Sequence, residues 1–331
     1  MEFKNKHKIQ KLKELIQQEL TPLINKDYAL VDFPNYKNIG DNLIWQGEID
    51  YLKDLPFKKS YSANVHTYRK ENMPSDCVIL LQGGGNFGDL YPALQNLRLD
   101  IIQNFPDHQI IMFPQTVYYK DEKLLEKHAQ IFNNHSQLTL CARDQVSYDL
   151  ITKYVDPSKI KMLPDMAFCM DLTKYHKEPT SGKNLYMERI DSEKNHSYTF
   201  EHISSFFQNQ NEIEIKDWPT YSMNSFVDYF TNKLHGLESK ISKKLIKTPI
   251  LKSLVHNDYG LKSKGNLEKY ILLGINFINT YDKIATTRLH GFILAVLLNK
   301  EVGIVDNSYG KNSNFYNTWM QDFDKISLIQ K

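Results

Sequence analysis

Residues 77–89 read CVILLQGGGNFGD, and this stretch decides how the chain folds. Its first five residues form a continuous apolar run, which is typical of a strand buried on both faces of a parallel sheet. The glycines that follow predict a turn. Residues 92–104 then read as a helix. This unit of strand, turn and helix predicts an α/β fold.

The same pattern recurs along the chain on both sides of this unit. Apolar runs predict further strands at residues 28–32, 110–113, 138–142, 160–163, 185–187, 212–215, 283–285 and 302–305. Helical patterns lie between them. Because strands alternate with helices, we expect parallel sheets.

A polar stretch at residues 171–183 has the composition of a linker. The chain of 331 residues also exceeds the usual size of one core, about 100 to 200 residues, so we expect two domains. The predicted units are an N-terminal helix in 1–26, α/β domains in 27–175 and 183–312, and a C-terminal helix in 313–331.

Charge and cysteine content exclude several classes of protein. With 41 basic and 39 acidic side chains the formal net charge is +2, so no global field attracts nucleic acid and we expect no nucleic-acid partner. The three cysteines, Cys77, Cys141 and Cys169, lack Cys-x-x-Cys spacing. This argues against zinc and against a disulfide framework, and it favours a reducing compartment.

Two features bear on membranes. The chain lacks a run of roughly 20 apolar residues, the length of a transmembrane helix, and its charged N-terminus does not resemble a signal peptide. We therefore expect a soluble, cytoplasmic protein. The Lys-rich residues 224–269 predict a helical segment. A basic amphipathic helix there would allow peripheral membrane contact, but we favour a solvated helical face.

The glycines at 83–85 form the first candidate site. Without side chains, their backbone N–H groups can approach a phosphate or carboxylate closely. The spacing is not that of the dinucleotide fingerprint, and such glycines often form only a tight turn. Binding of an anion or sugar and a purely structural turn both remain open.

Residues 286–291, TTRLHG, form the second candidate site, between a predicted strand and an apolar helix. Ligands bind at the carboxyl ends of parallel strands, and the N-terminus of the next helix favours an anion. Arg288 adds a permanently charged fork, and His290 can exchange protons near neutrality. The alternative is structural: Arg288 pairs with a carboxylate and His290 bonds to the backbone.

Other polar residues also follow predicted strands. Arg143 is a second candidate cation, although a structural pair with an aspartate is nearly as plausible. Asp165 and Asp191 also follow predicted strands, and their structural alternative is a helix or interdomain salt bridge. Lys311 either reaches a phosphate or is a solvated charge.

Seven motifs occur in order within residues 28–319. They are NIGD at 38–41, LQGGGNFGD at 81–89, PQT at 114–116, ARD at 142–144, LPD at 163–165, TRLHG at 287–291 and DNSYGK at 306–311. Taken together, they resemble the polysaccharide pyruvyl transferases, and the ordered set is far more specific than any single motif. Thr116 and Asp144 are conservative departures from versions that are common in the family.

This resemblance implies a fold and a reaction. The fold would be two Rossmann-like domains with parallel sheets that face a cleft, as in GT-B glycosyltransferases. The reaction would move pyruvate from phosphoenolpyruvate onto a sugar of a cell-surface or exopolysaccharide precursor as a ketal. The partners would be the phosphoenolpyruvate donor and the sugar acceptor, with no metal and no other cofactor.

The resemblance also implies roles for residues. Arg288 and Arg143 would bind the carboxylate or phosphate of the donor, and His290 would be the general acid. The remaining substrate-binding residues expected are Lys311, Gly84, Gly85, Asn86, Asn38, Asp41, Gln115 and Asp89.

Several alternatives stay open at this point. A GT-B-type glycosyltransferase using a nucleotide sugar would need the same glycines and basic residues. A non-catalytic glycan-binding protein of polysaccharide assembly would also fit. Either Asp41 or Asp89 could accept the proton of the acceptor hydroxyl. The sequence does not determine the acceptor sugar, its lipid or nucleotide carrier, or the oligomeric state.

Overall fold

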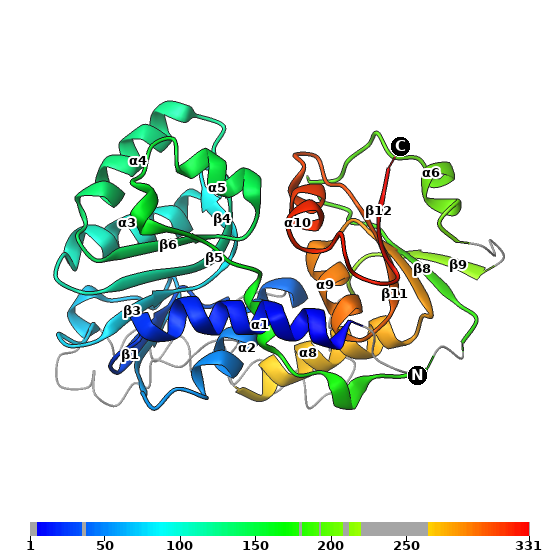
Figure 1. Ribbon diagram of the computed structural model, residues 1–331, viewed down its shortest axis with the longest axis horizontal. Coiled ribbons are helices and arrows are strands. Elements are labelled where there is room, and N and C mark those ends of the chain that lie inside the picture. The colour runs from blue at the N-terminus through cyan, green and yellow to red at the C-terminus, as the bar shows by residue number, and fades with distance from the viewer. Residues whose placement is uncertain are drawn as a thin grey trace.

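The computed structural model describes residues 5–34, 38–178, 181–191, 193–207, 212–219 and 264–330. In these residues the chain forms two α/β domains that lie side by side (Figure 1). Every strand pair among them is parallel, which confirms the predicted fold class.

The described part of the first domain is built on a seven-stranded sheet. Its strands are β1 (Tyr28–Val31), β2 (Lys59–Ala63), β3 (Val78–Leu81), β4 (Gly84–Gly88), β5 (Ile110–Tyr118), β6 (Leu138–Ala142) and β7 (Ile160–Met162). The order is β2-β1-β3-β5-β6-β7, and β4 pairs with β5. The order reverses between β1 and β3, so ligands are expected at the carboxyl ends of these two strands.

Helices cover both faces of this sheet. Ile79 packs with α3 and α4 on one face, and its neighbour Leu80 packs with α1 and α2 on the other. This alternation explains why β1 and β3 are apolar throughout. The helices are α1 (Lys6–Leu20), α2 (Ile39–Leu52), α3 (Pro92–Asn104), α4 (Glu122–Asn134) and α5 (Gln145–Ile151). Short 3-10 helices are η1 (Thr21–Leu23), η2 (Lys70–Asn72), η3 (Pro157–Lys159), η4 (Met166–Cys169) and η5 (Thr173–Tyr175).

The described part of the second domain is built on a five-stranded sheet of order β12-β11-β10-β8-β9. Its strands are β8 (Asn184–Met187), β9 (Ile213–Lys216), β10 (Lys283–Thr286), β11 (Glu301–Val305) and β12 (Ile326–Ile329). Its helices are α6 (Phe200–Ser204), α8 (Lys264–Asn279), α9 (Leu289–Leu297) and α10 (Lys311–Trp319). The strand order reverses between β8 and β10, which places a second ligand-binding edge at their carboxyl ends.

Two predicted elements differ from those in the structure, the C-terminal helix and the turn after β3. The expected C-terminal helix in 313–331 ends at Trp319, and residues 326–329 form β12, because Ile326 and Ile329 bury their side chains beside β11. Residues 84–88, expected as a turn, form β4. This segment lies close against β5 because it is rich in glycine: a Cβ on Gly88 would lie 1.7 Å from the carbonyl oxygen of Tyr118. The Lys-rich segment predicted at 224–269 lies, up to residue 263, outside the described residues.

Helix α1 joins the two domains, and in Figure 1 it runs beneath both of them. Its side chains Ile16 and Leu20 are buried in the core that contains α2 and η4. At its other end, Asn5 exchanges two hydrogen bonds with Asp324 in the loop before β12. The Nδ2 atom donates to the Asp324 carbonyl at 2.9 Å, and Oδ1 accepts from the Asp324 N–H at 2.9 Å.

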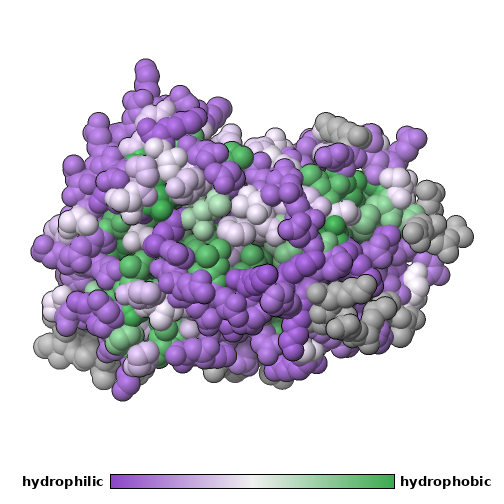
Figure 2. Space-filling view, viewed as in Figure 1, coloured by the Kyte–Doolittle hydropathy of each residue, from purple (hydrophilic) through white to green (hydrophobic). Residues whose placement is uncertain are grey.

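Most of the surface seen in Figure 2 is polar. Large apolar side chains that are exposed in the described residues come from both domains: Leu90, Tyr91, Val146, Ile190, Phe200, Ile215 and Leu272. No helix in this part of the chain combines the length and the apolar character needed to cross a membrane.

Gly47 allows α2 to pack against η4, because a Cβ at this position would lie 2.0 Å from the carbonyl oxygen of Met166. We expect Gly47→Ala to lower the free energy of unfolding by about 1–3 kcal/mol, the usual cost of overpacking a core. Urea unfolding measures this loss, with Glu126→Ala on the exposed face of α4 as the control. Equal stability of the two variants would contradict the close packing.

Candidate active site

A cavity of about 370 Å³ lies between the domains, where the ligand-binding edges of both sheets meet. Its lining comprises Asn38, Gly40, Asp41, Gly85, Asn86, Tyr91, Leu94, Arg143, Arg189, Glu193, Trp218, Arg288, Leu289, His290 and Lys311. A larger hollow of about 1020 Å³ runs along α2 and α8 and reaches Phe33 and Pro34 just after β1, but none of the predicted site residues line it. The smaller cavity is lined by most of the predicted site residues, so we identify it as the candidate active site.

The structure brings most of the predicted site residues to this cavity. Those in the lining are Asn38, Asp41, Gly85, Asn86, Arg143, Arg288, His290 and Lys311. Gly84, Gln115 and Asp89 are not in it. Gln115 is fully buried and holds the glycine segment, donating to the Gln82 carbonyl at 2.7 Å. Asp89 accepts from the backbone N–H groups of Lys120 and Asp121 and stabilises the turn after β5.

His290 and Arg143 meet at one buried carboxylate, that of Asp165. Its Oδ2 atom accepts from Arg143 Nη1 at 2.7 Å and lies 3.3 Å from His290 Nε2. Asp165 follows β7 in the first domain, whereas His290 lies in the first turn of α9 in the second. An ionised carboxylate can only accept, so Nε2 carries the hydrogen in this contact, and the other ring nitrogen, Nδ1, lies toward Gly40.

The electrostatics of this cluster favour charge on Asp165. Burial opposes ionisation, but the facing charges of His290 and Arg143 outweigh it and hold the pKa of Asp165 well below its usual range. Its second oxygen accepts from the Ala167 N–H at 2.9 Å. The carboxylate is therefore ionised at neutral pH and orients both His290 and Arg143.

Helices α2 and α9 bring their N-termini together at the cavity. Asn38 caps α2, since its Oδ1 accepts from the Gly40 N–H at 2.9 Å. A Cβ on Gly40 would lie 2.7 Å from His290 Nδ1, so only glycine allows this approach. Unpaired N–H groups and the helix dipole favour an anion at such an end, and here two ends act on one space.

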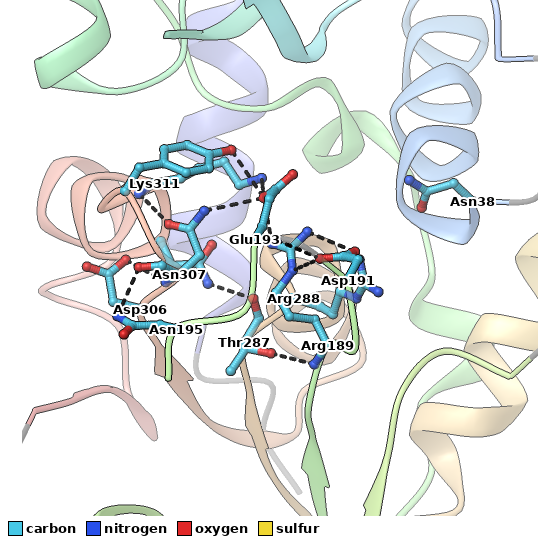
Figure 3. A network of polar contacts seen from close by, with 12 residues as sticks. Asn38, Arg189, Asp191, Glu193, Asn195, Thr287, Arg288, Asp306, Asn307 and Lys311 are labelled. Carbon is cyan, nitrogen blue, oxygen red and sulfur yellow. Dashed lines mark hydrogen bonds and ion pairs between the residues drawn. The ribbon is translucent and has the colours of Figure 1, made fainter. Parts of the chain in front are cut away.

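On the second-domain side, the cations of the cavity are paired with carboxylates (Figure 3). Arg288 donates to both oxygens of Asp217, at 2.8 and 2.6 Å, and to Asp191 at 2.8 Å. Arg288 thus pairs with carboxylates, as the structural alternative predicted, and it also lines the cavity. Three of its N–H groups are used in these pairs. Arg189 likewise binds Asp191 through Nε at 2.7 Å.

Glu193 accepts hydrogen bonds from several other side chains on the second-domain side of the cavity. Its Oε2 atom accepts from Arg189 at 2.6 Å, Lys311 at 3.0 Å, Tyr309 at 3.1 Å and Asn307 at 3.3 Å. Burial opposes ionisation, but Lys311 and Arg189 lower the pKa of Glu193 to about 2. Lys311 is therefore a paired cation beside the cavity rather than a solvated charge.

For the glycine segment the sequence left anion or sugar binding and a structural turn open, and the structure shows contacts of the structural kind. Its N–H groups are largely used by the protein: Gly83 donates to Glu48, Asn86 to Gln115 and Gly88 to Gln95. The absent side chain matters most at Gly85, where a Cβ would lie 3.1 Å from Arg143 Nη2 and 3.8 Å from Lys311 Nζ. Gly85 therefore leaves space through which these two cations reach the cavity.

Several site residues escaped the sequence analysis. Arg98 is fully buried and donates to Asp32 at 2.7 Å and to the Asn86 carbonyl at 2.8 Å, which fixes the position of Asn86. A buried arginine in a helix gives no sequence signal of this role. Arg189 and Glu193 were visible only as charges after a strand, because their partners come from distant parts of the chain.

Glu48 on α2 supports the glycine segment from behind. Its Oε1 accepts from the Gly83 N–H at 2.8 Å, while its buried Oε2 has no partner among the described residues. Burial raises the pKa of Glu48 well above its usual value, and the bond from Gly83 offsets only part of this.

A carboxyl group with a raised pKa in the folded state makes the protein lose stability as pH rises from the unfolded pKa to the folded one. We expect wild type to lose stability between pH 5 and pH 8 relative to Glu48→Gln, whose neutral amide does not titrate. Urea unfolding at both pH values measures the difference. The same pH dependence in both proteins would rule out a raised pKa at Glu48.

Comparison with known proteins shows the family of the chain. The family described as polysaccharide pyruvyl transferase matches residues 38–309. EpsO of Bacillus subtilis, whose name assigns it provisionally to the pyruvyl transferases, is 31% identical over 98% of this chain and 96% of its own length. Pyruvyl transferase 1 of Schizosaccharomyces pombe is 26% identical, over 92% of this chain and 73% of its own length.

The crystal structure of an uncharacterized protein from Klebsiella pneumoniae shares the fold. It has a TM-score of 0.63 and 23% identity, and the match covers 97% of this chain and 99% of that one. The two domains with facing parallel sheets are thus a fold that a solved structure also shows. By its motifs and relatives, the chain is a transferase that belongs to the polysaccharide pyruvyl transferase family.

Proposed function

We propose that this protein transfers pyruvate from phosphoenolpyruvate onto a sugar of a cell-surface or exopolysaccharide precursor and forms a ketal. Family membership supports pyruvyl transfer to a polysaccharide. The donor and the ketal product are our proposal. The observation that carries it is the placement of His290, held by Asp165 beside Arg143, between two facing helix N-termini.

The charge on the cavity walls suits this donor. Phosphoenolpyruvate carries a carboxylate and a phosphate on one small carbon frame. Arg143 offers Nη2, for which the described residues provide no acceptor, and Arg288 retains two N–H groups. With the N-termini of α2 and α9, these groups supply preorganised donors for the charge of the transition state.

In the proposed mechanism, His290 donates a proton from Nδ1 to the methylene carbon of phosphoenolpyruvate. The central carbon becomes oxocarbenium-like, and a sugar hydroxyl bonds to it as its own proton leaves. The C–O bond to phosphate then breaks, and a second hydroxyl closes the ketal. Of the two hydroxyl hydrogens, one balances the new methyl group and the other leaves with phosphate.

The reaction needs no redox cofactor, because the enol ester and the ketal have the same oxidation level. A cytoplasmic location belongs to the proposal, as does a sugar acceptor on a lipid or nucleotide carrier.

His290→Gln tests the role of the acid. We expect phosphate release from phosphoenolpyruvate in the presence of an acceptor sugar to fall by about 10²–10⁴-fold in kcat, the usual contribution of a general acid. The matched control is His66→Gln at an exposed position away from the cavity, which should retain activity. Full activity of His290→Gln would remove His290 from the mechanism.

The same assay separates the reaction classes. If wild type transfers a sugar from a nucleotide sugar and leaves phosphoenolpyruvate intact, the protein is a glycosyltransferase and the proposal fails. Tight glycan binding without turnover would instead show a binding protein.

Gly40→Ala tests the close approach of α2 to His290. The added methyl group would displace the ring from Asp165, so we expect kcat to fall at least tenfold, while circular dichroism stays that of the wild type. Glu126→Ala on the exposed face of α4 is the control, and it should retain activity. Undiminished activity of Gly40→Ala would show that the ring can move without cost.

A further inference from the structure

The proposed reaction needs a base for the acceptor hydroxyl, and the cavity limits the choice. Among the described lining residues only Asp41 and Glu193 are acidic. Asp165, Asp191 and Asp217 lie behind the lining, each bonded to Arg143, Arg189 or Arg288. A carboxylate bound to a guanidinium is held in its ionised form and is a weak base.

Glu193 is a poor base for the same reason. Four donors share its Oε2 atom, two of them cationic. Taking up a proton there would break the pairs with Arg189 and Lys311 and leave two buried cations without a partner. The structure gives Glu193 the task of holding these cations in place.

Asp89, the other base that the sequence left open, is also excluded by its position. One of its oxygens accepts two backbone N–H groups, at 2.7 and 2.9 Å, and the residue does not line the cavity. It therefore stabilises a turn.

Asp41 differs from all of these carboxylates. Its side chain makes one bond among the described residues, from Asn38 Nδ2 to Oδ2 at 2.8 Å. Asn38 is neutral, so it orients the carboxylate without fixing its charge. Because the second oxygen, Oδ1, has no partner in this part of the chain, it can accept a hydroxyl hydrogen from the cavity.

The position of Asp41 matches the geometry of the reaction. It follows Gly40, the residue that lies against His290, so Asp41 and His290 reach the same cavity from the first turns of α2 and α9. In Figure 3, Asn38 stands on α2 across the cavity from the cationic cluster around Arg288. An acceptor on the α2 side would meet Asp41 while the donor anion meets the cations opposite.

We propose that Asp41 is the catalytic base, which accepts the proton from the acceptor hydroxyl as its oxygen bonds to the central carbon of the donor. The proton passes from the hydroxyl to Oδ1, and the electron pair of the O–H bond forms the new C–O bond. This inference rests on the proposed pyruvyl transfer and adds the acceptor side of the site to it.

The experiment compares Asp41→Asn, Asp41→Ala and Asp89→Asn with wild type in the full chain. We expect Asp41→Asn to lose about 10²–10⁴-fold in kcat, as for loss of a general base, while KM for phosphoenolpyruvate changes less than threefold. Asp89→Asn, which keeps an acceptor oxygen for the two N–H groups, should retain kcat within about threefold.

Chemical rescue separates a base from a structural group. Asp41→Ala removes a carboxyl group, so added formate should restore part of kcat in this variant but not in Asp41→Asn or His290→Gln. Wild type with formate shows any inhibition at the anion site. A folded Asp41→Asn with kcat near wild type, or an inactive Asp41→Ala that formate does not rescue, would overturn the assignment.

The outcome for the proposed function is read separately. If wild type itself releases no phosphate from phosphoenolpyruvate with any acceptor, pyruvyl transfer fails and the inference with it. If wild type is active, Asp41 alone is tested. Should Asp41→Asn not fold, formate rescue of Asp41→Ala and full activity of Asp89→Asn still decide the question.

Discussion

The candidate active site depends on one buried carboxylate, Asp165. It lies at the end of β7, bonds to Arg143 at the end of β6 and reaches His290 in the other domain. Burying this charge is costly unless both partners stay in place, and removing one partner of such a pair typically costs about 3–5 kcal/mol. The same bonds that stabilise the ionised carboxylate therefore hold His290 and Arg143 in place at the cavity.

The remaining cations follow the same principle. Arg189, Arg288 and Lys311 each pair with a carboxylate from a neighbouring loop, so this wall of the cavity is ordered without a ligand. An anion gains less from such paired charges than from bare ones. In return, the hydrogen-bond donors need not reorganise when charge develops in a transition state. Such preorganisation is the main source of electrostatic catalysis.

Much of this fold could be predicted from local sequence, because its strands and helices coincide with apolar patterns that have recognisable ends. Pro92 marks the start of α3, and the run at 77–81 marks β3. The partners in the site could not be predicted, since Arg288 meets Asp191 and Asp217 across 97 and 71 positions, and His290 meets Asp165 across 125. Such distances are bridged only by the folded sheets.

The glycines show a similar limit of prediction from sequence. The glycines at 83–85 predicted a close approach, and in the structure Arg143 comes close to Gly85. The similar approach of His290 to Gly40 was not predicted. β12 was missed because four residues with two buried isoleucines carry too short a pattern to tell a strand from the end of a helix.

Helix α1 has a mechanical consequence. A helix of 15 residues is a stiff rod of about 22 Å, and this one is fixed in the first core and tied to the second domain through Asn5 and Asp324. It therefore restrains how far the two domains can separate. Any wider separation of the domains would have to break the two hydrogen bonds between Asn5 and Asp324.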